Sequence, residues 1–301
     1  LVSQAVIGAF ALLFAGALFG IPGLDAVAAS PLYLPLLIVI AGLQVGVLYL
    51  STQHLGKPIR FYRGFNNLRH SPLSREALGV SLFMSFLSAH FVFSLFDHGV
   101  PGLFGSDAVA GLLPWFSPAF ANGLAMVTGA LAVLAGLGAL YFMHAIYRIK
   151  ARPFWNHWQV LTSFYGTMLS LGGVLIGLVC AGVADAALLA TLAVFVTIGL
   201  IAEGIGLVAH ARDMLRQGGE GAAAHYMLTT KHGYSYLLRN AAMAVNIVAV
   251  VALGLAEPTG IAAALLWGAT GLSILLTALV GRALFYVVVI PTTMPGAFFW
   301  R

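Results

Sequence analysis

Long apolar runs separated by short polar segments dominate the chain. The runs are continuous and rich in Ala, Leu and Gly, and they lack the apolar–polar alternation of membrane β-barrel strands. Each is about 20 residues long, the length that an α-helix needs to cross a hydrocarbon core roughly 30 Å thick. The pattern predicts an all-α polytopic membrane protein.

Eight transmembrane helices are expected, with boundaries defined to within a few residues. They cover residues 3–22, 33–53, 77–97, 122–147, 159–182, 187–210, 240–256 and 260–286. The first is expected to be a span preceded by a few further residues, since the apolar core of a signal peptide is shorter. The chain contains neither a soluble domain nor a clear repeat, so residues 1–301 are expected to form a single membrane domain.

The composition supports a lipid environment. Hydrophobic residues make up 61% of the chain and charged residues only 8%, whereas about a quarter of a soluble protein is charged. Small residues let membrane helices approach closely, so Gly172, Gly173 and Gly177 are expected to pack against neighbouring helices. A single cysteine, Cys180, excludes an intrachain disulfide, and neither an Fe–S cluster nor a structural zinc site is expected in this chain.

The basic residues all fall on one side of the predicted topology. If even-numbered spans end on a near side, all 14 Lys and Arg residues lie on that side. The charged residues on the far side are all acidic, namely Asp25, Asp97, Asp107, Asp185 and Glu257. Because the Lys/Arg bias of loops sets orientation, the near side and both termini are expected to be cytoplasmic.

One near-side stretch, "HLGKPIRFYRGFNNLRHSPLSRE" (residues 54–76), combines basic, aromatic and proline residues. Positive charge alone would fix its topology. Its length and its aromatic residues favour in addition an interfacial helix or a platform for a soluble partner. The expected docking residues are Lys57, Arg60, Arg63, Arg69 and Arg75.

Several titratable residues are expected in the cytoplasmic half of the membrane, where a buried polar group costs about a few kcal/mol. They are His54, Glu76, His144, Glu203, His210 and Arg282. Such groups beside an apolar pocket suit a quinone, whose ring exchanges protons when its redox state changes. Glu203 shares a helix face with His210 and forms a candidate proton relay with Thr197. For each single histidine, an interhelical hydrogen bond is the alternative.

Haem is the rival ligand, because two histidines on neighbouring spans can ligate one iron. His90 is expected about 21 Å from the cytoplasmic end of its span and His144 about 6 Å from the end of its own, so these two cannot share a haem. The expected depths of His54, His144 and His210 still allow His54 to share a haem with either of the other two. Quinone binding without haem is the expectation.

The stretch of residues 54–76 resembles the signature loop of the DmsC family, the membrane anchors of dimethyl-sulfoxide-reductase-type molybdoenzymes. The match lies in the His-Leu-Gly-x-Pro-x-Arg start at His54 and in the Leu-Ser-x-Glu end at Glu76. The Ala202-Glu203 pair and "GRALFY" (Gly281 to Tyr286) are also similar, and Ala151 to Trp158 matches loosely. The resemblance covers nearly the whole chain.

The resemblance implies a three-subunit oxidoreductase in the bacterial inner (cytoplasmic) membrane. A catalytic subunit would carry a molybdenum bis(pyranopterin guanine dinucleotide) cofactor, and an Fe–S subunit would carry [4Fe–4S] clusters. This chain would anchor both and bind ubiquinone or menaquinone. The implied roles are hydrogen bonding to a quinone carbonyl for His54, proton exchange for Glu76 and positioning for Arg282.

The charge distribution departs from that of the best-known family member, whose signature loop faces the periplasm. Sulfite dehydrogenase relatives have cytoplasmic catalytic subunits and share the Leu-Ser-Arg-Glu form found at Leu73 to Glu76. The hypothesis is therefore the anchor of a cytoplasm-facing, sulfite-oxidising and quinone-reducing enzyme. The alternatives are the anchor of a DMSO- or polysulfide-type reductase that oxidises quinol, a purely structural anchor, and a small-solute transporter.

Overall fold

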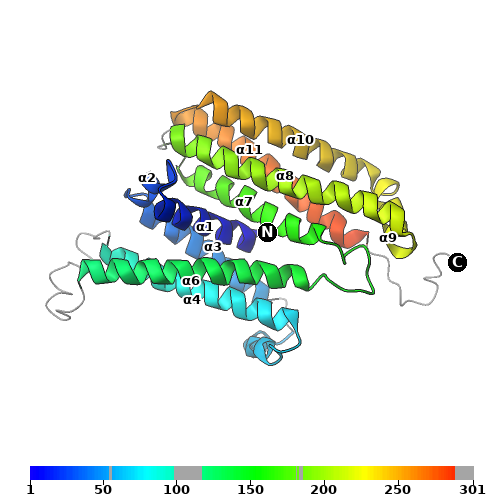
Figure 1. Cartoon of the computed structure of the whole chain (residues 1–301), viewed down its shortest axis with the longest axis horizontal. Helices are drawn as coiled ribbons and strands as arrows, with labels where there is room; N and C mark the ends of the chain where they lie inside the picture. The colour runs from blue at the N-terminus through cyan, green and yellow to red at the C-terminus, as the bar shows by residue number, and fades with distance from the viewer. Residues whose placement is uncertain (54–55, 98–116, 181, 183–185, 289–301) are drawn as a thin grey trace. The chain divides into compact units, whose positions relative to one another are not determined.

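The computed structural model describes residues 1–53, 56–97, 117–180, 182 and 186–288 (Figure 1). All regular secondary structure in these ranges is helical. In chain order the helices are α1 (Val2–Phe19), α2 (Leu24–Ala28), α3 (Tyr33–Gln53), the 3₁₀ helix η1 (Pro58–Phe65), α4 (Pro72–Asp97), α6 (Pro118–Ala145), α7 (Gln159–Cys180), α8 (Ala186–Gln217), α9 (Gly219–Thr229), α10 (Gly233–Ala256) and α11 (Gly260–Val287).

Eight of these helices are long and apolar enough to cross a membrane, which confirms the predicted number. The main differences lie at the near-side ends, where the helices run past the apolar runs. Helix α4 begins at Pro72 instead of residue 77, α8 continues to Gln217, and α10 begins at Gly233 instead of residue 240. A helix satisfies its own backbone hydrogen bonds, so it extends into polar sequence that a hydropathy pattern excludes.

Three short helices lie in segments that the apolar pattern leaves as loops. Helix η1 falls within the stretch of residues 54–76, where an interfacial helix is one of the two expectations, and all of its residues up to Arg63 are exposed. Helix α9 follows α8 after Gly218, whose φ of 69° favours glycine. Helix α9 packs against both α8 and α10.

The chain divides into two compact units, and α1 contributes to both. The C-terminal unit comprises Ser3–Ala9 of α1 and the chain from Met143 onward, and it contains α7 to α11. In this unit α7, α8, α10 and α11 lie side by side, as Figure 1 shows, with α7 packed against α8 and α11. Helix α7 is the most buried of the candidate spans.

Small residues make the close packing of α7 feasible, as the sequence predicts. A Cβ atom at Gly172 would lie 2.6 Å from the backbone of Gly8, and one at Gly173 would lie 2.7 Å from a methyl group of Val196. At Gly177 the indole of Trp267 occupies the space that a Cβ would need. All three predicted glycine contacts are confirmed, and any larger residue at these positions would push the helices apart.

The N-terminal unit holds the rest of α1 together with α2, α3, η1, α4 and most of α6. Its core contains His90 of α4, which is 3% exposed. The His90 Nδ1–H donates to the carbonyl oxygen of Ala125 (2.7 Å), and Nε2 accepts from the Tyr33 hydroxyl (2.6 Å). The rings of Phe10 and Phe14 pack edge-on against this imidazole. His90 thus matches the alternative of a histidine satisfied by interhelical hydrogen bonds.

Candidate functional site

A pocket opens inside the C-terminal unit at the near-side ends of its helices. It contains about 660 Å³ of empty space, part of it open to the surroundings. Its apolar wall comes from α7, α8, α9 and α11 and from the segment before α7, through Phe154, Val160, Leu207, Leu228, Leu284 and Phe285. Polar groups on this apolar background give the pocket its chemistry.

Three charged side chains from three different helices line the pocket: Glu203 of α8, Arg239 of α10 and Arg282 of α11. Both guanidinium groups lie within electrostatic reach of the Glu203 carboxylate. Two arginines against one glutamate leave an excess of positive charge when all three are ionised. In a low-dielectric setting this excess favours a ligand with electron-rich oxygen atoms.

The position of Arg282 is fixed by two contacts. Its Nη2–H group donates to Oε1 of Gln4 at the start of α1 (3.0 Å), and its guanidinium carbon lies 4.1 Å from the centre of the Phe164 ring. A cation over an aromatic face is stabilised by the ring quadrupole. Arg282 is therefore held against α1 and α7 and presents a preorganised positive charge to the pocket.

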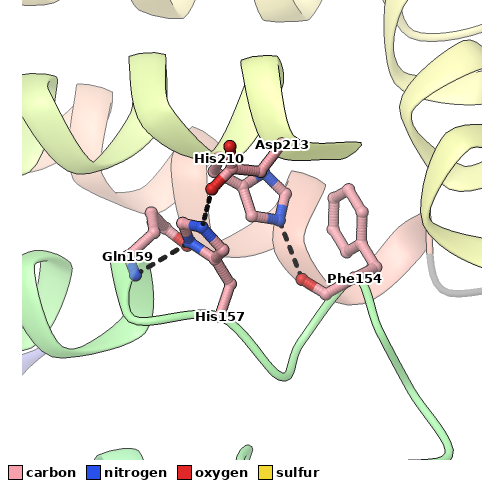
Figure 2. Close-up of polar contacts among 5 residues, drawn as sticks. All are labelled: Phe154, His157, Gln159, His210 and Asp213. Carbon is pink, nitrogen blue, oxygen red and sulfur yellow. Dashed lines mark hydrogen bonds and ion pairs between the residues drawn. The ribbon is translucent and has the colours of Figure 1, made fainter. Parts of the chain in front are cut away.

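A histidine network adjoins the pocket, which is lined by its members Phe154, Gln159 and His210. Figure 2 shows the contacts of this network. The backbone N–H of Gln159 donates to Nδ1 of His157 (3.0 Å), so the neutral His157 ring carries its proton on Nε2 and donates it to the Asp213 carboxylate (3.0 Å). The neighbouring His210 donates from Nε2 to the carbonyl oxygen of Phe154 (2.8 Å). In the neutral ring this leaves Nδ1 of His210 as an acceptor.

The segment before α7 that carries Phe154 is fixed from two sides. The Phe154 N–H donates to Oε2 of Glu220 in the first turn of α9 (3.1 Å), and its ring packs edge-on against His210 with centroids 4.7 Å apart. Next to it, the Trp155 indole N–H donates to the carbonyl oxygen of Phe285 (3.0 Å), and the two rings stack. These contacts join α7, α9 and α11 around the pocket mouth.

Helices α9 and α10 form a further wall through His225, Tyr236 and Arg239. His225 is 6% exposed and Arg239 is 5% exposed. Nδ1 of His225 and Nε of Arg239 are buried without a hydrogen-bond partner among the residues that the structure describes. Burial lowers the pKa of His225 below its ordinary value, which keeps the ring neutral at pH 7.

The structure brings three of the predicted site residues together: Glu203, His210 and Arg282 all line the pocket. His144 is buried near the end of α6 and is not among the lining residues. Glu76 belongs to α4 in the N-terminal unit, and His54 lies outside the described residues.

The predicted docking residues Lys57, Arg60, Arg63 and Arg69 are exposed. Arg75 differs, because its guanidinium donates to the backbone carbonyl oxygens of Leu68 (2.8 Å) and Arg69 and lies over the Phe142 ring. Arg75 therefore holds the end of this stretch against α4 and α6, and the four other basic residues present the charge.

Sequence reasoning missed the wall of His225, Tyr236 and Arg239. Arg239 was expected in a loop before the seventh span, yet it lies nearly two turns inside α10. A basic residue flanking an apolar run was the available signal. For His225 the sequence offers none, because α9 is short and lacks an apolar periodicity of its own.

A family comparison agrees with the resemblance of the signature stretch. A model of the DMSO reductase anchor subunit (DmsC) family matches residues 1–288. No curated protein matches the chain significantly. The segments of family-like sequence in the C-terminal unit converge on the pocket, since Phe154, Glu203, Gly281 and Arg282 all line it.

Proposed function

The chain belongs to the DmsC family of membrane anchor subunits, and on this premise we propose that it passes electrons between an Fe–S subunit and the membrane quinone pool. Anchors of this family assemble with the catalytic and Fe–S subunits of DMSO-reductase-type molybdoenzyme complexes. The eight apolar helices make the chain a multi-pass membrane protein. The quinone would be a mobile substrate of this subunit.

One observation carries the proposal: Glu203, His210 and Arg282 meet in an apolar pocket at the helix ends. A quinone ring needs apolar walls, donors for its carbonyl oxygens and groups that exchange protons. The pocket offers all three. Arg282 is held to donate to a ring oxygen, while Glu203 and the acceptor atom Nδ1 of His210 are suited to exchange a proton with it.

The family resemblance supports a further part of the proposal, which does not depend on this pocket. We propose that His54 hydrogen-bonds a quinone carbonyl, that Glu76 exchanges protons, and that His144 also takes part in quinone chemistry. The exposed Lys57, Arg60, Arg63 and Arg69 bind the acidic surface of the Fe–S subunit.

The orientation follows from charge. We propose that the near side is cytoplasmic, because all 14 Lys and Arg residues fall there by sequence. Lys57→Cys tests this, since the single native thiol, Cys180, is buried. A membrane-impermeant maleimide should label the variant only after the cells are permeabilised. Labelling of intact cells would place the loop on the outer side and overturn the orientation.

Sulfite is the proposed substrate of the partner catalytic subunit, with quinone as the electron acceptor. The cytoplasmic orientation and the Leu73 to Glu76 form of the motif support this assignment. The purified complex should reduce decylubiquinone with sulfite as the donor. Turnover only with dimethyl sulfoxide or polysulfide and a quinol would contradict it.

The test of quinone chemistry uses Glu203→Gln and Arg282→Gln in the assembled complex, beside His54→Ala and Glu76→Gln. Each variant loses a group that we propose to hydrogen-bond the quinone or to exchange protons with it, so decylubiquinone-linked turnover should fall about tenfold or more. Turnover with a soluble dye that accepts electrons from the Fe–S subunit should stay unchanged. The matched control is Arg216→Gln, at an exposed position of α8. Intact assembly with unchanged quinone-linked turnover in all four variants would refute the quinone role.

A further inference from the structure

Two buried nitrogen atoms of the pocket stand out because no residue that the structure describes forms a hydrogen bond with them. They are Nε of Arg239 and Nδ1 of His225, on residues that are 5% and 6% exposed. A buried polar group without a hydrogen bond costs about 1–3 kcal/mol. Other polar groups of the same pocket are satisfied within the protein: Arg282 binds Gln4, and His210 binds Phe154. The two unpaired atoms are therefore a local feature of one wall.

Tyr236 holds this wall together. The Arg239 guanidinium carbon lies 5.5 Å from the centre of the Tyr236 ring, and the His225 and Tyr236 rings meet edge-on with centroids 6.4 Å apart. Tyr236 lies one turn before Arg239 on α10, so both side chains occupy the same helix face. The aromatic ring thus supports a donor from α10 and a histidine from α9.

The chemistry of the two groups defines what they can bind. The Nε–H of a guanidinium only donates, so Arg239 requires an acceptor oxygen. The neutral His225 ring donates from one nitrogen and accepts at the other. A ligand oxygen that is a carbonyl in one redox state and a hydroxyl in the other can pair with such an imidazole in both states. The positive charge of Arg239 adds a preference for an electron-rich oxygen.

We propose that Arg239 and His225, positioned by Tyr236, are ligand-contacting residues of this pocket and hydrogen-bond the ring oxygens of a bound quinone. This inference rests on the proposed quinone function and adds two residues to its site. Arg239 donates from Nε, and His225 pairs with a ring oxygen through Nδ1. Arg282 then provides a second, separately anchored positive charge in the same pocket.

The test measures binding of decylubiquinone to the whole purified complex in lipid nanodiscs. Arg239→Gln should raise the dissociation constant about tenfold, the effect of one lost charge-assisted hydrogen bond. Arg239→Lys keeps the positive charge but lacks the planar Nε–H group, so its dissociation constant should lie between those of wild type and Arg239→Gln. His225→Phe should weaken binding several-fold, whereas His225→Gln keeps a hydrogen-bonding side chain and should bind better than Phe. Arg216→Gln is the matched control.

A spectroscopic readout separates a direct contact from a structural effect. In redox-difference infrared spectra recorded with ¹³C-carbonyl-labelled quinone, loss of a donor raises the carbonyl stretching frequency. Arg239→Gln and His225→Phe should each raise it, and Arg239→Lys should raise it less than Gln. Thermal stability of each variant complex, measured alongside, identifies any that fails to fold; Arg239→Lys and His225→Gln then carry the comparison.

Two results are decisive against the inference and differ from a failure of the quinone site. If Arg239→Gln and His225→Phe bind quinone within about twofold of wild type with an unshifted carbonyl band, while Arg282→Gln loses binding, these two residues are not contacts and the quinone function stands. If Arg282→Gln and Glu203→Gln also bind normally, the pocket does not hold quinone, and this inference falls together with the pocket's part in the proposed function.

Discussion

The packing of α7 against α8 gives the sharpest quantitative prediction. A Cβ atom at Gly199 of α8 would lie 2.5 Å from the carbonyl oxygen of Gly166 and 2.8 Å from the backbone nitrogen of Ser170, both on α7. Since ordinary C···O contacts begin at about 3.3 Å, Gly199→Ala has to separate the helices by about 0.8 Å. Backbone atoms on both sides leave no flexible side chain to give way.

The cost of this separation is that of overpacking, about 1–3 kcal/mol. Against it stands the higher helix propensity of alanine, worth at most about 1 kcal/mol. Gly204→Ala on the same helix provides the control, because its Cβ would meet only Met243 Sδ at 3.7 Å, an ordinary contact. The difference between the two variants therefore isolates the packing cost from the propensity gain.

The assay is the temperature at which half of the detergent-solubilised complex loses its monodisperse peak in size-exclusion chromatography. Gly199→Ala should lower it by a few degrees, and Gly204→Ala should leave it unchanged or raise it. Quinone-linked turnover should fall with Gly199→Ala as well, because a Cβ at Gly166 would lie 3.2 Å from Glu203 Cβ and the same interface thus positions this carboxylate. Equal stability of the two variants would refute the close-packing argument.

Three further predictions concern the polar network, the pH and the docking surface. Asp213→Asn removes the carboxylate that accepts a hydrogen bond from His157, so quinone-linked turnover should fall. The loss of stability should be small, because the Asp213 side chain is 37% exposed. Unchanged turnover would contradict a role of Asp213 in holding His157. Burial holds the pKa of His225 below 6.5 in the folded protein, so below pH 6.5 the unfolded chain binds more protons and the folded state loses stability on acidification. His225→Gln should flatten this pH dependence of the melting temperature. An unaltered pH profile would contradict the contribution of His225. Replacing both Arg60 and Arg63 by Ser should weaken retention of the Fe–S subunit during affinity purification, and the difference from wild type should be largest at low salt. The control Lys231→Ser should retain the Fe–S subunit as wild type does. Equal retention in the double variant and the control would argue against docking at Arg60 and Arg63.

The fold was largely predictable because the bilayer imposes a simple rule on the sequence. Apolar runs report directly on the lipid-facing length of each helix, so the eight spans and the glycine contacts of α7 follow from hydropathy and residue size. The near-side ends of α8 and α10 could not be predicted from hydropathy, because both helices continue into charged sequence. Arg239 lies in such a continuation, and so an argument from apolar windows places it in a loop before the seventh span.

The candidate site was predictable in its residue types and only partly in its geometry. Glu203 and His210 were expected on one face of one helix, and both line the pocket. The contribution of α9 depends on tertiary packing: Ala223, Ala224 and Leu228 join a core with Phe154 and Leu284, which come from opposite ends of the unit's sequence. No local pattern encodes such a cluster, so the position of His225 required the structure.

The geometry of the C-terminal unit explains why segments far apart in sequence form one site. The pocket is lined by the start of α7, the second half of α8, His225 and Leu228 of the short α9, the start of α10 and the end of α11. The four long helices among these are successive antiparallel spans, and they line the pocket with their near-side ends. Every span of the unit thus contributes the end that carries the basic residues. A ligand that enters the pocket would meet the charged side chains Glu203, Arg239 and Arg282 at these ends. By sequence, the basic residues of the proposed docking stretch and those of the proposed quinone pocket fall on the same predicted side of the membrane, which is what an anchor that links an Fe–S subunit to the quinone pool requires.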